Sequence, residues 1–496
     1  MQKSEYRFWL ISYWFKLITD YFTGKLITRF TDMAYPKSLP YIIANEAAER
    51  FSFYGMRSIL TTFLVVQFFN PALNPSLQGI AEAQANEATH FFVSLAYAVP
   101  FLGAVAADWF FGKYKVILWI SILYCFGHLI LSMFEKDFDV FRIGLVLIAI
   151  GAGGIKSCVS ANVGDQFNAE NKHLLTKVYG WFYFSINAGS AVSTLVIPLV
   201  YAAYGPKWAF GIPGILMAVS TLIFYSGRKT YVRVPPAGIK KDNFLFISVY
   251  ALAHFYKRKP GASLLDVAKE RFNPEKVEDI KAVYRVIGIF SFIPLFWAMW
   301  DQNLSEWVLQ AGKLDRHILG YELLPQQVQT VNPFFLLLLI PVFNYGIYPF
   351  FERRGIKTSP LRRIGAGLIL MVISFIVIAI LQGAVDKGLS PSIWWQVLAY
   401  FILAAAEVMV SVTCLEYAYT HAPASMKSTM GAVWLLTIAV GNFFTALVNR
   451  SISNQGFFSS FQGASYYWLF IGLMLVLILI YLVVSPRIKE QSYLHQ

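Results

Sequence analysis

Twelve long apolar segments recur along this 496-residue chain, and they restrict its fold more than any other feature. Each is long enough to cross the hydrocarbon core of a bilayer, which takes about 20 helical residues. Because no water reaches that core, a spanning segment has to satisfy its backbone hydrogen bonds internally, as a helix does. The sequence therefore predicts an all-α membrane protein with spans at 38–69, 87–108, 115–134, 141–163, 178–203, 208–227, 285–309, 331–351, 363–384, 393–420, 428–449 and 464–485.

The basic charge of the chain follows this topology. Its formal net charge is +13, although only 14% of the residues are charged. With both termini on one side, the loops of that side carry 31 Lys and Arg, whereas the opposite side carries seven. Basic loops stay in the cytoplasm. We therefore expect cytoplasmic termini and no nucleic-acid partner, and the short loops favour a bacterial inner (cell) membrane.

Two sets of six spans flank a polar stretch at 228–284. This plan is typical of transporters in which two bundles rock around a central site. We predict bundles at 38–227 and 285–486, with 228–284 as a cytoplasmic linker and 487–496 as a cytoplasmic tail. The functional unit is expected to be a monomer embedded in lipid.

Three further segments have a predicted conformation. Residues 1–37 are expected to form a cytoplasmic extension with an amphipathic helix on the membrane surface. In the linker, 243–256 is apolar but too short to span, so we expect an interfacial helix there. The charged residues 264–284 are expected to form one surface helix.

The first span carries four charges in its middle, on Glu46, Glu49, Arg50 and Arg57. One such residue costs roughly 3 kcal/mol at the bilayer centre, so these four have to face protein or water. At about 100° per residue they share one side of a helix with Tyr54, and Glu46 and Arg50 have the i,i+4 spacing of an ion pair. Two carboxylates beside one arginine leave an acid that could take a proton. A buried structural ion-pair cluster is the alternative.

Other ionisable residues lie deep in later spans: His90, Lys156, Asp301, Glu407 and Glu416. His90 fits a hydrogen-bonded packing residue and a proton site equally well. Glu416 is close to the end of its span, so solvation is a sufficient explanation for it. The deep acids outnumber the deep bases by five to three. Surplus acid suits a proton or an ammonium group, and the bases suit a carboxylate, which together describe a pocket for a zwitterion such as a short peptide.

Four motifs resemble those of the proton-dependent oligopeptide transporter family, within the major facilitator superfamily. Residues 46–55 are similar to the E-x-x-E-R signature of its first helix, 153–167 to its second signature and 182–189 to its third. Residues 108–112 are similar to the loop motif between helices 2 and 3. The resemblance covers about 38–486. It implies a major facilitator fold, proton-coupled symport of di- and tripeptides, and no cofactor or metal beyond protons as co-substrate.

Position by position, the resemblance also implies site residues. Proton coupling falls to Glu46, Glu49, Arg50 and His90. The peptide is bound by Tyr54, Arg57, Tyr97, Lys156, Asn187, Trp297, Asn332, Glu407, Ser411 and Trp434. In this set Arg57 and Lys156 attract the carboxylate, and Glu407 binds the amino group. The gates are ion pairs, Arg57–Asp301 on the outer side and Lys156–Glu407 on the inner side.

Two residues depart from the family pattern, and several functions compete. Ser157 stands where the family usually has proline, and Trp109 where the loop motif usually has arginine. A nitrate carrier needs no partner for an ammonium group, so Glu407 argues against it, and the basic pair Arg57/Lys156 argues against a drug antiporter. A carrier of another zwitterion, another anion or a peptide-like drug remains, as does a non-transporting peptide sensor. No nucleophile–base pair points to an enzyme.

Overall fold

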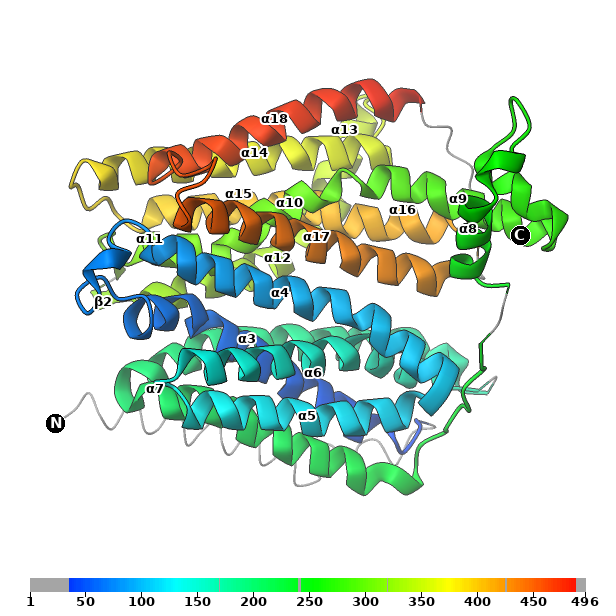
Figure 1. Ribbon diagram of the computed structural model, residues 1–496, viewed down its shortest axis with the longest axis horizontal. Helices are drawn as coiled ribbons and strands as arrows, with labels where there is room; N and C mark the ends of the chain where they lie inside the picture. The colour runs from blue at the N-terminus through cyan, green and yellow to red at the C-terminus, as the bar shows by residue number, and fades with distance from the viewer. Residues whose placement is uncertain (1–34, 169, 240–241, 319, 424–425, 488–496) are drawn as a thin grey trace.

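Helices that run in one common direction make up almost the whole molecule (Figure 1). The computed structural model describes residues 35–168, 170–239, 242–318, 320–423 and 426–487. The predicted helix near the N-terminus and most of the tail lie outside the described residues. The first half of the chain forms α3 (Leu39–Gln67), α4 (Ala81–Ala106) with the π-helix η2 (Ala107–Phe111), α5 (Lys113–Met133), α6 (Phe138–Asp165) and α7 (Leu175–Ser226).

The second half repeats this arrangement with more interruptions. It contains α9 (Pro274–Phe290), α10 (Ile293–Trp300), η7 (Asp301–Leu304), α11 (Glu306–Ala311), η8 (Pro325–Thr330), α12 (Val331–Pro341), the π-helix η9 (Val342–Ile347), α13 (Tyr348–Arg353), α14 (Pro360–Asp386), α15 (Trp394–Glu407), the π-helix η10 (Val408–Val412), α16 (Thr413–His421), α17 (Lys427–Ser453) and α18 (Ala464–Val484). A two-stranded antiparallel hairpin, β1 (His317–Ile318) and β2 (Tyr321–Glu322), closes one loop. We call that end of the molecule the hairpin end and the opposite end the linker end.

Nine helical segments of the described part are long and apolar enough to cross a membrane, and the bent pair α9 and α10–α11 makes a tenth. Two of the predicted spans are merged in α7, which Gly205 divides at a φ of 78°. Glycine adopts this conformation without steric cost, and Pro206 then begins the second half of the helix. The remaining span is α3, whose mid-helix charges lower its hydropathy. Each of the twelve predicted spans thus corresponds to a helix of the structure.

The buried apolar side chains form one large cluster in each half of the chain. In the N-terminal half α3 lies against α7, and α6 against α4 and α5. In the C-terminal half α14 lies against α15 and α18. The two halves meet mainly where α4 lies beside α17, in the middle of Figure 1. The molecule is therefore built from two helical bundles with separate cores.

The linker crosses the linker end of both bundles. It contains α8 (Phe244–Ala253), which stands across the direction of the other helices in Figure 1, and η6 (Leu264–Glu270). Trp109, the residue in place of the loop arginine, stacks on Phe246 of α8 with ring centroids 6.3 Å apart. The backbone N–H of Ala237 also donates to the carbonyl of Asp108, at 2.8 Å. An aromatic contact and a backbone bond thus connect this loop to the linker.

The prediction of one surface helix over 264–284 is wrong. The 3₁₀ segment η6 ends at Glu270, and α9 begins at Pro274 and continues into the membrane-spanning pair. Proline disfavours a helical conformation in the residue before it. That residue, Asn273, instead caps α9, because its side chain accepts a hydrogen bond of 2.8 Å from the backbone N–H of Glu275.

Candidate functional site

The charged side chains of α3 are buried and contact one another. The Arg50 Nε lies 2.7 Å from Glu46 Oε1 and 3.0 Å from Glu49 Oε2. Its N–H points at Glu46, so the contact with Glu49 is electrostatic and both Glu49 oxygens lack a hydrogen-bond donor within the described residues. Gly189 lets α7 approach this stretch, because a Cβ there would lie 2.7 Å from the carbonyl of Ala47. One guanidinium thus serves two carboxylates, and Glu49 is the less satisfied of them.

Lys156 enters the same region from α6. The glycines before it let α6 pack closely on its neighbours: a Cβ on Gly151 would collide with Tyr124, and one on Gly153 with the carbonyl of Ala96. The Lys156 Nζ lies 4.1 Å from the ring centre of Phe53 and 3.9 Å from that of Tyr97. It is buried without a hydrogen-bond partner in the described part of the chain.

A polar chain joins the two bundles at Arg57. Its guanidinium pairs with Asp301 of η7, and both side chains are 2% exposed. Asn442 of α17 donates its amide to the other Asp301 oxygen. Because that amide is used, the Asn442 oxygen accepts from His90 Nδ1, at 2.8 Å. His90 Nε2 lies 2.8 Å from the Ser305 hydroxyl, which donates to a neutral ring and accepts from a protonated one.

His90, a member of these polar contacts, belongs to a longer row of polar side chains on α4, which faces the C-terminal bundle. We call this row the seam. The seam residues recur every four positions, so they form one stripe along the helix. Their partners all lie across the bundle interface. The contacts are Glu82 with Lys313 (2.7 Å), Asn86 with Glu306, His90 with Asn442 and Ser305, and Ser94 with the carbonyl of Ala439 (2.8 Å). The seam closes the hairpin half of the interface between the bundles.

Glu407 is the last residue of α15, directly before the π-helix η10. Such π-helical segments often accompany functional sites. Trp300 donates its indole N–H to Glu407 Oε2 at 3.0 Å, and the amide of Asn332 donates to the same oxygen at 3.2 Å. Within the described residues no basic group forms an ion pair with Glu407.

Five of the predicted peptide-binding residues carry a buried polar atom that no described residue satisfies. An unsatisfied buried group costs about 1–3 kcal/mol, so such atoms are expected to bind solvent or a ligand. They come from both bundles. The atoms are Arg57 Nε, Lys156 Nζ, Trp297 Nε1, Asn332 Oδ1 and Ser411 Oγ.

The other predicted residues occupy less informative positions. Tyr54 is half-buried on α3, and Trp434 packs on Trp297 with ring centroids 5.7 Å apart. Asn187 donates its amide to the Tyr183 carbonyl of its own helix, at 2.8 Å. Glu416 lies 3.2 Å from Arg363 at the linker end, so it is paired and separate from the cluster.

One predicted ion pair is absent from the structure. Arg57 and Asp301 are paired, but no ion pair joins Lys156 and Glu407 among the described residues. This conformation is closed at the hairpin end.

Sequence reasoning missed Asn442, Ser305 and Trp300. All three are uncharged, and a neutral side chain in an apolar span carries no signal that separates it from a packing residue. Only their contacts with His90, Asp301 and Glu407 reveal them.

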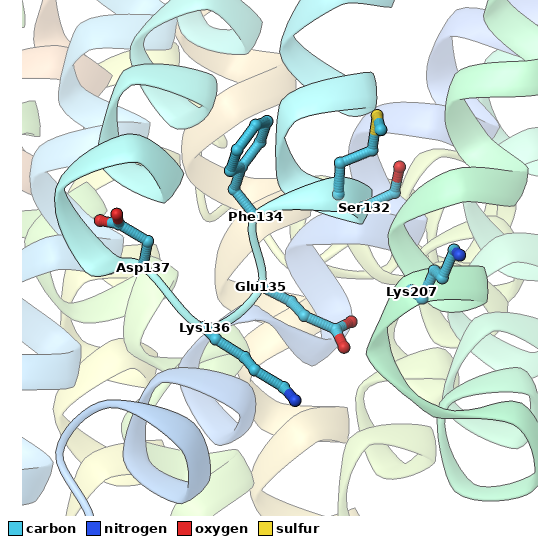
Figure 2. Close-up of a pocket in the computed structure, with 7 residues that line it drawn as sticks. Ser132, Phe134, Glu135, Lys136, Asp137 and Lys207 are labelled. Atoms are coloured by element: carbon cyan, nitrogen blue, oxygen red, sulfur yellow. The ribbon is translucent and has the colours of Figure 1, made fainter.

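A surface hollow of about 480 Å³ lies away from these charges, between the α5–α6 loop and Lys207 of α7 (Figure 2). It is lined by Ser132, Met133, Phe134, Glu135, Lys136, Asp137 and Lys207. None of the predicted site residues lines it.

Several known proteins are similar to this chain in sequence and in fold. Residues 114–469 match the POT family. "Peptide transporter family 1" of Drosophila melanogaster is 38% identical over 375 residues, which cover 71% of this chain and 48% of that protein. "Solute carrier family 15 member 2" of Rattus norvegicus is 34% identical over 402 residues, which cover 77% and 54%. The chain thus spans about half the length of the curated relatives it matches.

Two solved structures cover nearly the whole fold. The POT family transporter PepTSo is 35% identical, with a TM-score of 0.85 over 92% of this chain and 99% of that one. An auto-inhibited POT family peptide transporter is 33% identical, with a TM-score of 0.84 over 93% and 99%.

Fold and buried charges together define a multi-pass membrane protein of the two-bundle, major facilitator type. The E-x-x-E-R signature at 46–50 and the loop motif at 108–112 precede the matched range, and the second and third signatures fall within it. The chain belongs to the POT family, whose members are transporters and not enzymes.

Proposed function

We propose that the protein is a proton-coupled symporter that imports di- and tripeptides by alternating access. The observation that carries this proposal is a pair of opposite charges, Lys156 in one bundle and Glu407 in the other, that have no counter-ion among the described residues. A short peptide carries a carboxylate and an ammonium group at its two ends. Its carboxylate binds Lys156 and Arg57, and its ammonium group binds Glu407.

The balance of deep charges supports a proton as co-substrate. With Glu416 paired elsewhere, four acids (Glu46, Glu49, Asp301 and Glu407) face three bases (Arg50, Arg57 and Lys156). One negative charge is therefore uncompensated, and a neutral zwitterion cannot remove it. One added proton can neutralise this charge. Glu49 and His90 are the groups whose surroundings allow them to bind that proton. Glu46 and Arg50 complete the coupling group.

The distribution of basic residues supports an orientation in an inner membrane in which both termini and the linker end lie on the cytoplasmic side. The bundles, 38–227 and 285–486, are then the moving units, and the seam closes the outer side. A zwitterion that enters with one proton carries one positive charge inward. A membrane potential of 100 mV contributes about 2.3 kcal/mol to that step, or roughly a 50-fold concentration ratio.

Uptake of a labelled dipeptide into proteoliposomes tests the proposal. We expect accumulation when an inward proton gradient and a negative-inside potential are imposed, and its collapse on addition of a protonophore. Binding without accumulation would favour a peptide sensor instead. Accumulation that ignores the gradient would favour an exchanger.

A second prediction concerns the seam. Ser94 and Ala439 touch across the interface of α4 and α17, so cysteines at both positions should form a disulfide that holds the hairpin end closed. We expect the oxidised double variant to lose nearly all uptake and to regain it under reducing conditions. The two single-cysteine variants are the controls. Full uptake by the oxidised protein, with cross-linking verified by mass spectrometry, would contradict opening at this seam.

A further inference from the structure

Trp300 contacts Glu407, a deep carboxylate that forms no ion pair with a described residue. It is the last residue of α10, and its indole N–H donates to Glu407 Oε2 at 3.0 Å. Asn332 of α12 donates to the same oxygen at 3.2 Å. No described residue donates to the other oxygen, Oε1. The two donors approach from two helices, so they fix both the position of the carboxylate and its rotation.

The indole of Trp300 is itself held in place. Its ring meets that of Trp297 at a centroid distance of 5.4 Å and an angle of 75°, an edge-to-face contact. Trp297 contacts Trp434 in the same way, at 5.7 Å, and Trp434 contacts Phe290 at 5.4 Å. Trp297 and Trp434 are 6% and 8% exposed, whereas Trp300 is only partly buried. A row of packed rings therefore sets the direction of the Trp300 N–H.

We propose that Trp300 is a positioning residue for the amino end of the peptide. By occupying Oε2 together with Asn332, it leaves Oε1 as the Glu407 atom that meets the ligand ammonium group. Hydrogen bonds to an ionised acceptor are about twice as strong as neutral ones, and a carboxylate held in one orientation loses no rotational freedom on binding. Trp300 thereby selects peptides with a free amino terminus. This inference rests on the proposed function, in which Glu407 binds that group.

Trp300→Phe tests the inference, because phenylalanine keeps an aromatic ring in the row of packed rings but has no N–H to donate to Glu407. We compare KM and kcat for a dipeptide and for its N-acetylated form in proteoliposomes. The variant should raise KM for the free dipeptide about ten-fold, with kcat little changed, which corresponds to roughly 1.4 kcal/mol. KM for the N-acetylated form should not change. In a Glu407→Gln background, Trp300→Phe should have no further effect on the ratio of the two KM values.

The matched control is Trp307→Phe, an indole of the same bundle that packs on Tyr400, away from Glu407. Trp307→Phe should leave the ratio of the KM values for the free and the N-acetylated dipeptide unchanged. Asn332→Leu removes the other donor to Oε2 and should move the ratio in the same direction as Trp300→Phe. It gives an independent test if Trp300→Phe does not reach the membrane.

The outcomes separate this inference from the function beneath it. An equal loss for both peptides would make Trp300 a packing residue and overturn the inference. If Glu407→Gln abolishes the preference for the free amino group and Trp300→Phe does not change it, only the role of Trp300 fails. If Glu407→Gln leaves the preference intact, the proposed binding mode itself is wrong.

Discussion

The Glu49→Gln variant should lose gradient-driven accumulation of peptide while it retains exchange of labelled for unlabelled peptide across the membrane. Glu49 shares Arg50 with Glu46, and neither of its oxygens receives a hydrogen bond from a described residue. A glutamine amide cannot take up or release the proton, so peptide movement continues without a driving force. At 100 mV the accumulation ratio should fall from roughly 50 to about 1.

Parallel uptake and counterflow assays in the same proteoliposomes provide the measurement. Glu416→Gln is the matched control, because that carboxylate also belongs to a helix of a predicted span, in the other bundle, but pairs with Arg363 at the linker end. It should accumulate peptide like the parent protein. A Glu49→Gln protein that still concentrates peptide against its gradient would remove Glu49 from the coupling group and leave His90 as the candidate.

The Lys156→Gln variant should raise KM for dipeptides roughly 100-fold. Truncating one member of a desolvated charge pair costs about 2–5 kcal/mol, and about 3 kcal/mol corresponds to this factor. The Lys156 Nζ is buried against the rings of Phe53 and Tyr97 without a hydrogen-bond partner among the described residues, so the substrate carboxylate is its expected counter-ion.

A C-terminally amidated dipeptide separates charge recognition from packing. The parent protein should bind it weakly, and Lys156→Gln should not weaken it further. Lys136→Gln, which removes an exposed lysine of the α5–α6 loop, is the control for the loss of a positive charge. Equal weakening of the free and amidated peptides by Lys156→Gln would place Lys156 in the structural framework and not in the carboxylate site.

The twelve spans could be predicted because each had to bury about 20 apolar residues in lipid, a requirement that acts locally and is visible in the sequence. The ends of the helices depended on residues that interrupt a helix. Gly205 and Pro206 divide α7 at the expected place, but the break at Asn273 and Pro274 was missed within a charged stretch. There the cap and the proline decided the helix boundary, and charge did not.

The charged residues of the site could be named from the sequence, because a charge in an apolar span is costly and needs an explanation. Helical spacing also gave the Glu46–Arg50 contact. The roles of these residues stay predictions. The uncharged members, Asn442, Ser305 and Trp300, could not be identified from the sequence, since a neutral side chain in an apolar span is explained equally well by packing.

The sequence by itself determined the class of protein, the number of its spans and the inventory of its deep charges, since lipid acts on each segment separately. The tertiary structure decided which charges on different helices meet in this conformation. Asp301 pairs with Arg57 across 244 residues of sequence, whereas Lys156 and Glu407 remain apart. Such pairings depend on how two bundles with separate cores are placed against each other, and no periodicity within one helix carries that information.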